Sequence, residues 1–222
     1  MSEVKLIENF VSWQGEGPDS GRAMAILRFK TCDRKCSWCD TAVKMRISAE
    51  APYKISDIQK ILYEAKAGIL ITGGEPTVAR HFDECVMLLN ELSYPVANVE
   101  SNGHALLQLV KTVKPNDFIK YIYSPKIFNE KDLDLANELT ENIVGFPNVH
   151  IKVVYEDNPL VIKYLDRLHE HYENLAWQHR IWLMPEGTTR TDLIRNAGMV
   201  FDACERYKFN FSSRSHIIFG FV

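Results

Sequence analysis

The sequence predicts a single α/β domain across residues 1–222, built as an open or partial barrel with helices outside. Short apolar runs alternate with amphipathic helical patterns, and no repeat, low-complexity tract or linker interrupts them. The parallel strands, about six, are fewer than a closed eight-stranded barrel requires. A doubly wound sheet is the alternative, and in both folds ligands bind at the carboxyl ends of the strands.

Strands are predicted where four or more apolar or β-branched residues lie between Gly, Pro or polar residues. Such runs occupy residues 5–13, 23–30, 69–72, 96–100, 119–123, 150–154 and 180–184, and a last strand is predicted near residues 216–219. A Gly- and Pro-rich turn over residues 14–21 joins the first two strands.

Helices are predicted where apolar residues recur at i, i+3, i+4 and i+7. The first begins at Ser56, where Ser56 and Gln59 match a capping box, and ends at Gly68. Asn158 and Thr189 are expected to cap two later helices. The other helical patterns lie over residues 82–92, 104–113 and 133–139. Residues 42–53, rich in basic and small side chains, are interpreted as a surface loop.

Composition excludes several classes of protein. The formal net charge of −3 argues against a nucleic-acid surface, and no apolar run approaches the length of about 18 residues that a membrane span needs. The first residues lack the basic start and apolar core of a signal peptide. Three of the five cysteines lie within eight residues, which is unlike a disulfide framework. We therefore expect a cytoplasmic protein without direct nucleic-acid or membrane contact.

Cys32, Cys36 and Cys39 form a C-x3-C-x2-C loop directly after a predicted strand. Thiolates at this spacing suit a [4Fe-4S] cluster, whose usual complement is four Cys ligands, so three leave one iron open to a small molecule. A zinc site completed by a His or a distant Cys is the alternative. Cys85 and Cys204 lie on apolar helix faces and are expected to be buried hydrophobic residues.

Gly73-Gly74-Glu75-Pro76 follows a predicted buried strand. Two glycines allow close backbone approach to a ligand, and free carbonyls at a strand end can accept from an ammonium group. Taken alone, the segment is also consistent with a simple turn before a helix. Trp38, between the last two loop cysteines, is expected either to shield a cluster or to lie in the core.

The cysteine loop, with an aromatic residue before its last Cys, together with a strand ending in GGEP resembles the radical S-adenosylmethionine superfamily. The resemblance implies a partial TIM-like barrel of the radical-SAM type. It also implies a [4Fe-4S] cluster whose open iron is chelated by S-adenosylmethionine, which is cleaved reductively to give a hydrogen-abstracting radical. No side chain is therefore assigned as catalytic, because the cofactors carry the radical.

A narrower resemblance covers nearly the whole chain. Its motifs are FVSWQGEGP (10–18), ILRF (26–29), CSWCDT (36–41), ITGGEP (71–76), VESNG (99–103), YSPK (123–126) and MPEGTTR (184–190). They look like those of the 7-carboxy-7-deazaguanine synthase family. This resemblance implies a Mg²⁺-dependent lyase that contracts 6-carboxy-5,6,7,8-tetrahydropterin to 7-carboxy-7-deazaguanine with loss of ammonia, in 7-deazapurine (queuosine-type) biosynthesis. It further implies a homodimer and an electron donor such as flavodoxin.

An alternative within the superfamily is an activase that installs a glycyl radical on a partner protein. Such an enzyme has a protein substrate and no affinity for a pterin. The Q-G-E-G and C-D-T motifs weigh against it.

The family resemblance also implies the site residues. Substrate contacts are expected from Trp13, Gln14, Gly15, Glu16, Arg28, Ser101, Arg214 and His216. Contacts to S-adenosylmethionine are expected from Trp38, Cys39, Asp40, Gly74, Glu75, Glu100, Gly103, Ser124, Pro125, Lys126, Met184 and Glu186. The Thr41 hydroxyl is expected to coordinate Mg²⁺. Simpler roles remain open: a solvated Arg28, a plain turn at Glu16, a free surface Lys126 and a helix-capping Glu186.

Overall fold

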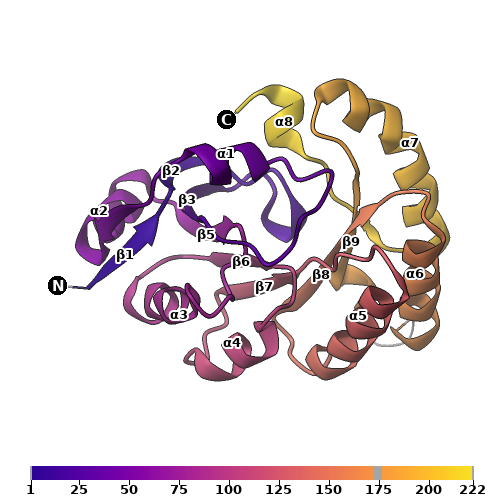
Figure 1. The fold of residues 1–222 in the computed structure, drawn as a ribbon, viewed down its shortest axis with the longest axis horizontal. Coiled ribbons are helices and arrows are strands. Elements are labelled where there is room, and N and C mark those ends of the chain that lie inside the picture. The colour runs from indigo at the N-terminus through magenta and orange to yellow at the C-terminus, as the bar shows by residue number, and fades with distance from the viewer. Residues whose placement is uncertain (1, 173–176, 222) are drawn as a thin grey trace. The chain divides into compact units, whose positions relative to one another are not determined.

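The computed structural model describes residues 2–172 and 177–221 and divides the chain into two compact units (Figure 1). Unit 1 consists of Met1–Gln14 and Gly21–Ile122, and unit 2 consists of Gly15–Ser20 and Tyr123–Val222. The expectation of a single domain across residues 1–222 stays a prediction.

Unit 1 contains a sheet of mostly parallel strands. Its strands are β2 (Glu8–Trp13), β3 (Ala23–Phe29), β5 (Gly68–Gly73), β6 (Ala97–Ser101) and β7 (Ile119–Tyr123, which ends at the boundary with unit 2), in the order β7-β6-β5-β3-β2. Strands β3, β5 and β6 run parallel, and β2 is antiparallel to β3. Phe29 pairs with Gly73, so β3 and β5 end level at one edge of the sheet.

A separate ribbon and four helices complete unit 1. The ribbon pairs β1 (Glu3–Leu6) with β4 (Ala51–Lys54) in antiparallel register. The helices are α1 (Ala42–Ile47), α2 (Ile55–Ala65), α3 (Phe82–Glu91) and α4 (Leu106–Thr112). Helix α2 buries Ile58 and Leu62, and α3 buries Cys85, Leu88 and Leu89, as their helical periodicity predicts.

Unit 2 has a parallel sheet in the order β10-β9-β8 and a row of helices (Figure 1). Its strands are β8 (Val149–Tyr155), β9 (Ile181–Pro185) and β10 (Asn210–Phe211); its helices are α5 (Glu130–Ile143), α6 (Pro159–Tyr172), α7 (Arg190–Tyr207) and α8 (Ser215–Phe219). Short 3-10 turns lie at Gly17–Asp19 and Trp177–Arg180. Helix α6 packs against α5 and α7, and α7 packs on β9.

The predicted α/β class with mostly parallel strands is confirmed, as are several local predictions. Asn158 Oδ1 accepts from the Leu160 N–H at 2.9 Å at the start of α6. Thr189 Oγ1 accepts from the Asp192 N–H at 3.2 Å at the start of α7. Cys85 and Cys204 are buried.

Two element predictions were wrong. Residues 216–219 form part of helix α8 rather than a strand: the N–H groups of Ile217 and Ile218 both donate to the Arg214 carbonyl, and Gly220 ends the turn at φ +69°. The paired isoleucines favour a strand by propensity, but these local hydrogen bonds decide the conformation. Residues 42–53 are not a plain loop, because they contain α1 and the strand β4 that pairs with β1.

The boundaries of α2 also differ from the prediction. Lys54 precedes the helix, and Ser56 donates to Asp57 rather than forming a capping box. Lys66, in the left-handed region at φ +50°, ends the helix, whereas Gly68 begins β5. A side chain at position 68 would meet Met24 and Val96 at 2.6 Å, so packing explains this glycine. The predicted first strand is divided at Ile7 into β1 and β2.

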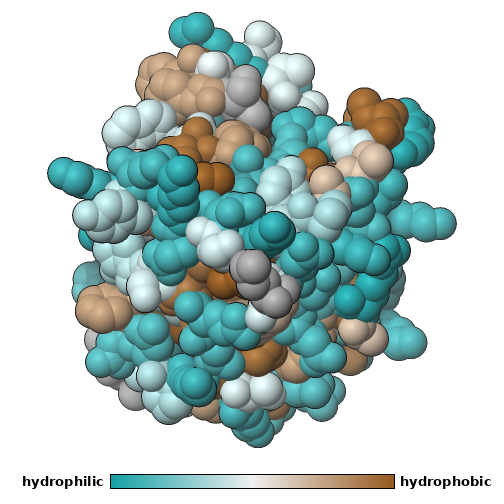
Figure 2. All heavy atoms as spheres, turned by 90° about the vertical axis from the view of Figure 1, so that its left-hand side faces the viewer, coloured by the Kyte–Doolittle hydropathy of each residue, from teal (hydrophilic) through white to brown (hydrophobic). Residues whose placement is uncertain are grey.

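In the described part of the chain, no helix combines the length and apolar character that a membrane crossing requires. Figure 2 shows one face of the molecule, on which hydrophilic side chains predominate and apolar ones form small separate groups. Such scattered exposure is normal for the surface of a folded protein.

Replacing Gly198 by Ala is predicted to stabilise the protein. Gly198 lies inside α7, and a Cβ at this position would have no heavy atom within 4 Å. Alanine is more favourable than glycine in a helix interior by roughly 0.5–1 kcal/mol, and urea unfolding should show this gain. The control Gly187→Ala should destabilise, because Gly187 has φ +148° and little space. A loss of stability in Gly198→Ala would contradict this account of α7.

Candidate functional site

The three loop cysteines follow β3 and precede α1 in unit 1. Each is half-buried, and the turn is held by the Cys39 N–H, which donates to the Cys36 carbonyl at 3.3 Å, and by the Arg34 N–H, which lies 3.4 Å from Cys32 Sγ. Burial raises the pKa of Cys32, raises that of Cys204 to about 11 and raises that of the fully buried Cys85 further. The loop thiols, unlike the helical ones, are accessible as metal ligands.

The three loop thiols are not gathered as closely as the ligands of a single zinc ion. Ligand sulfurs around one tetrahedral zinc ion lie about 3.8 Å apart, given a Zn–S bond of about 2.3 Å. Among residues 2–172 and 177–221, the loop cysteines belong to no group of three or more His, Cys, Asp or Glu ligand atoms that all lie within 4.8 Å of one another. Thiolates that bind different irons of one cube need no such proximity.

The glycines of the GGEP turn lie against the chain that leads into the cysteine loop. The Gly74 N–H donates to the Phe29 carbonyl at 3.0 Å, and the Glu75 N–H donates to the Thr31 carbonyl at 2.7 Å. A Cβ on Gly73 would lie 2.2 Å from the Phe29 oxygen, and one on Gly74 would lie 2.2 Å from the Thr31 oxygen. Only glycine permits this approach, so the turn fixes the start of the cysteine loop.

Glu75 points into unit 1 and joins the ends of β5 and β6. Its side chain is 1% exposed; Oε1 accepts from the Ser101 hydroxyl at 2.7 Å and from the Thr77 hydroxyl at 2.7 Å, and Oε2 accepts from the Asn102 N–H at 2.6 Å. Burial raises the pKa of Glu75 although these donors oppose the shift. Ser101 in turn accepts from the Gly103 N–H at 3.0 Å, so the predicted residues Glu75, Ser101 and Gly103 lie together.

Arg28 on β3 is part of a charged triad rather than a solvated side chain. Its Nε donates to Glu8 Oε2 at 2.6 Å, and Lys44 Nζ lies 2.6 Å from Glu8 Oε1. Burial would raise the pKa of Glu8, but Lys44 and Arg28 hold it below its ordinary value. Two cations and one anion give the triad a net charge of about +1, which suits an additional carboxylate.

The remaining predicted residues of unit 1 lie beside these groups along the chain. Thr41 precedes α1, makes no capping hydrogen bond, and places its hydroxyl 3.5 Å from Cys39 Sγ. Trp38 is half-buried, which excludes the core position, and Asp40 is exposed. The other members are exposed Trp13 at the end of β2, buried Gln14, whose Nε2 donates to Asn98 Oδ1, and Glu100 on β6.

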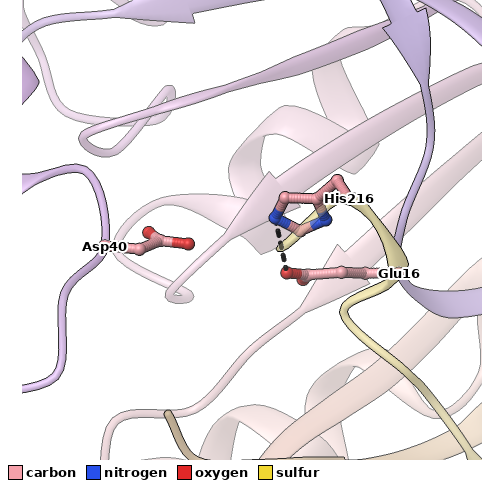
Figure 3. Close-up of side chains that lie close together, drawn as sticks. All are labelled: Glu16, Asp40 and His216. Carbon is pink, nitrogen blue, oxygen red and sulfur yellow. Dashed lines mark ion pairs between the residues drawn. The ribbon is translucent and has the colours of Figure 1, made fainter. Parts of the chain in front are cut away.

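Unit 2 holds a second set of predicted residues around buried Glu16. Glu16 Oε2 accepts from Lys152 Nζ at 2.5 Å, Oε1 accepts from Arg214 Nε at 3.0 Å, and His216 Nε2 lies 3.8 Å from Oε1 (Figure 3). Burial would raise the pKa of Glu16, but the charges of Lys152, Arg214 and His216 together hold it far below its ordinary value. Gly15 lacks space for a side chain, since a Cβ would lie 2.1 Å from His216 Nδ1.

The other predicted residues of unit 2 follow β7 or lie on and after β9. Lys126 Nζ donates to the Ser124 hydroxyl at 2.7 Å and to its carbonyl at 3.0 Å, so Lys126 is not a free surface lysine. Met184 is buried on β9, and the Glu186 carbonyl accepts from Asn196 Nδ2 at 2.8 Å. Pro125 is buried beside Ser124.

Sequence reasoning missed several polar residues that hold these groups. The ring of His81 is stacked on Phe29, and its Nε2 accepts from the Thr31 N–H at 3.2 Å. Burial lowers the pKa of His81, which favours the neutral ring, and only the neutral ring can accept this hydrogen bond at Nε2. Lys152 was also missed, although a lysine in the middle of an otherwise apolar strand is a usable signal. Asn102 and Asp33, which are hydrogen-bonded to each other, were missed as well.

Comparison with known proteins gave one consistent group of sequence relatives, while no family model matched. A Thermoplasma acidophilum protein is 32% identical over 58% of this chain and 55% of its own length. A Hyperthermus butylicus protein is 25% identical over 97% of this chain and 92% of its own, and a Clostridium acetobutylicum protein is 33% identical over 65% and 62%. All three are named 7-carboxy-7-deazaguanine synthase. The first and third matches thus span less than two thirds of those relatives.

Solved structures support the fold. QueE from Escherichia coli matches with a TM-score of 0.57 at 17% identity, over 95% of this chain and 93% of that one. Streptococcus suis SuiB bound to the precursor peptide SuiA matches with a TM-score of 0.55 at 19% identity, over 85% of this chain and 47% of that one.

The chain shares the fold of these solved structures, and within unit 1 it places a glycine turn against the start of a three-cysteine loop. The expected α/β fold class is confirmed by the mostly parallel strands and by the match to QueE and SuiB. In sequence, the chain is similar to proteins named 7-carboxy-7-deazaguanine synthase, one of which it matches over 97% of its own length at 25% identity.

Glu16→Gln is predicted to destabilise the protein by about 3–5 kcal/mol, because it leaves the buried charges of Lys152 and Arg214 without an anion. The folded-state pKa of Glu16 is lowered, so its contribution is present above the unfolded value of 4.5 and is lost as the pH falls below it. Urea unfolding between pH 7 and 3 should show a larger loss of stability in wild type than in the variant, in which Glu8 still contributes a pH dependence. The control Glu130→Gln, at an exposed pair with Lys163, should cost less than about 1 kcal/mol.

Gly74→Ala is predicted to displace the start of the cysteine loop. The added methyl group meets backbone atoms of Thr31, which cannot move aside as the end of a flexible side chain could. Overpacking of this kind costs roughly 1–3 kcal/mol. Thermal unfolding and iron content after anaerobic reconstitution should both fall. Gly145→Ala, where a Cβ meets nothing within 4 Å, is the matched control. Wild-type iron content in Gly74→Ala would contradict the role assigned to the turn.

Proposed function

We propose that this chain is a 7-carboxy-7-deazaguanine synthase, which converts 6-carboxy-5,6,7,8-tetrahydropterin to 7-carboxy-7-deazaguanine with loss of ammonia. The observation that carries the proposal is the contact of the glycine turn with the cysteine loop at the level ends of β3 and β5. It occurs in a chain whose relatives bear this enzyme's name. Ligands of parallel α/β folds bind at this edge of the sheet.

In this proposal Cys32, Cys36 and Cys39 hold the cluster, and the half-buried Trp38 between the last two shields it. When bound, the cluster and S-adenosylmethionine supply the radical that removes hydrogen from the substrate. The task of the protein is to orient: the Gly73-Gly74 turn holds the loop's first residues, and His81 accepts the Thr31 N–H just before Cys32. The Thr41 hydroxyl, free of a capping role, is proposed as a ligand of Mg²⁺.

Each unit holds charged groups whose chemistry suits part of a carboxypterin, and each is considered by itself. The triad of Arg28, Lys44 and Glu8 is net positive, and we assign it the substrate carboxylate. Glu16, which its cationic neighbours keep ionised, is an acceptor for ring N–H donors. The ion pairs of Arg28 and of Glu16 already hold these side chains in place before a substrate binds. Side chains that are held in this way need to move less during the reaction.

We further propose a cytoplasmic location, a homodimer and an electron donor such as flavodoxin. These follow from the family resemblance. Thiolate-held iron that must be reduced to function is compatible with a reducing compartment.

Anaerobically reconstituted protein, given reductant, S-adenosylmethionine, Mg²⁺ and the carboxypterin, is predicted to release 7-carboxy-7-deazaguanine, detected by mass spectrometry. Arg28→Gln should lower kcat/KM about 10- to 100-fold, the range expected for a lost charge-assisted hydrogen bond. Arg46→Gln, an exposed position on α1, should change it little. Fully cluster-loaded protein that yields no deazaguanine would reject the proposal and favour the activase, which acts on a protein.

A further inference from the structure

A hydrogen-bonded group at the end of β6 holds the cysteine loop. It contacts the loop just after Cys32, whereas the glycine turn contacts the chain just before Cys32. Asp33, the residue after Cys32, accepts from Asn102 Nδ2 at 2.7 Å through Oδ1, and its Oδ2 lies 3.1 Å from His104 Nδ1. We call Asp33, Asn102 and His104 the Asp33 clamp. All three belong to unit 1.

The Asp33 clamp is continuous with the buried network around Glu75. Asn102 uses its side chain for Asp33 and its backbone N–H for Glu75 Oε2 at 2.6 Å, while its Oδ1 accepts from the His104 N–H at 3.1 Å. The Nδ2, the Oδ1 and the backbone N–H of Asn102 thus each make one of these hydrogen bonds. The residue therefore links the glycine-turn motif to the cysteine loop in a second place, in addition to the backbone contacts of Gly74 and Glu75.

Asp33 lies next to a predicted cluster ligand, so its position affects the cysteine loop directly. Its Oδ1 lies 3.9 Å from Cys32 Sγ, in the three-residue stretch between the first two ligand cysteines. The neutral Cys32 thiol can donate to this carboxylate, but a thiolate that binds metal repels it, so Asp33 then needs other donors to stay in place. Asn102 and His104 supply these donors, so the clamp fixes the direction in which the loop leaves Cys32.

Resting on the cluster-binding part of the proposed function, we propose that Asp33 is a positioning residue: through Asn102 and His104, it sets the conformation of the cysteine loop and thereby the retention of the cluster. The residue itself contacts neither substrate nor cofactor in this account. Its effect is transmitted through the loop backbone.

The first test uses the apoprotein and needs no cluster. Hydrogen exchange of residues 31–41 should become about tenfold faster in Asp33→Ala and in Asn102→Ala, as expected when one or two charge-assisted hydrogen bonds are lost. Asp33→Asn, which keeps an acceptor oxygen for Asn102, should restore most of the protection. Because both the Asp33 and the Asn102 variants remove the contact between these two residues, the effect of the double variant should be smaller than the product of the two single effects. Asp134→Ala, at an exposed position of α5, is the matched control.

The second test uses reconstituted protein. Loss of iron to a chelator should be about tenfold faster in Asp33→Ala, and the change that S-adenosylmethionine causes in the paramagnetic spectrum of the reduced cluster should weaken. Wild-type exchange and iron release in Asp33→Ala, or independent multiplying effects of the two substitutions, would overturn the proposal. If wild-type protein takes up no cluster, the proposed function fails, while the exchange measurement still decides whether the clamp orders the loop.

Discussion

The close contact between two backbones, at Phe29–Thr31 and Gly73–Glu75, is the constraint on which the candidate site depends. Register brings the ends of β3 and β5 level, and two residues without side chains allow the following segments to approach within hydrogen-bonding distance. The cysteine loop therefore starts from a fixed point rather than from a free strand end. A cluster held by only three protein ligands needs such support, because its open iron must face a bound molecule in one direction.

Two buried glutamates show how environment assigns different roles to the same residue type. Glu75 accepts hydrogen bonds from hydroxyl and backbone donors without a cation, and burial raises its pKa. Glu16 is also buried, but Lys152 and Arg214 lower its pKa strongly. Glu75 is thus suited to holding β5 and β6 together, and Glu16 to presenting a charged acceptor. Removing the donors to Glu75, or the cations that pair with Glu16, would leave a buried carboxyl group without its partners.

The sequence allowed prediction of the features that depend on local pattern. Helix periodicity, the caps at Asn158 and Thr189, and the positions of the motifs at strand ends follow from neighbouring residues. What could not be predicted depends on partners distant in sequence or on very short elements. The pairing of Lys152 with Glu16 joins residues 136 positions apart, and the pairing of β4 with β1 required tertiary contact. The turn that makes α8 is too short for a periodic signal.

In the proposed function, three cysteines of this chain leave one iron available to S-adenosylmethionine. Electron–nuclear double resonance of the anaerobically reconstituted, reduced protein tests it directly, with S-adenosylmethionine labelled by nitrogen-15 at its amino group. The account predicts a nitrogen-15 coupling to the cluster that disappears when unlabelled cofactor is used. The absence of any coupling, together with stoichiometric zinc bound by Cys32, Cys36 and Cys39, would contradict it.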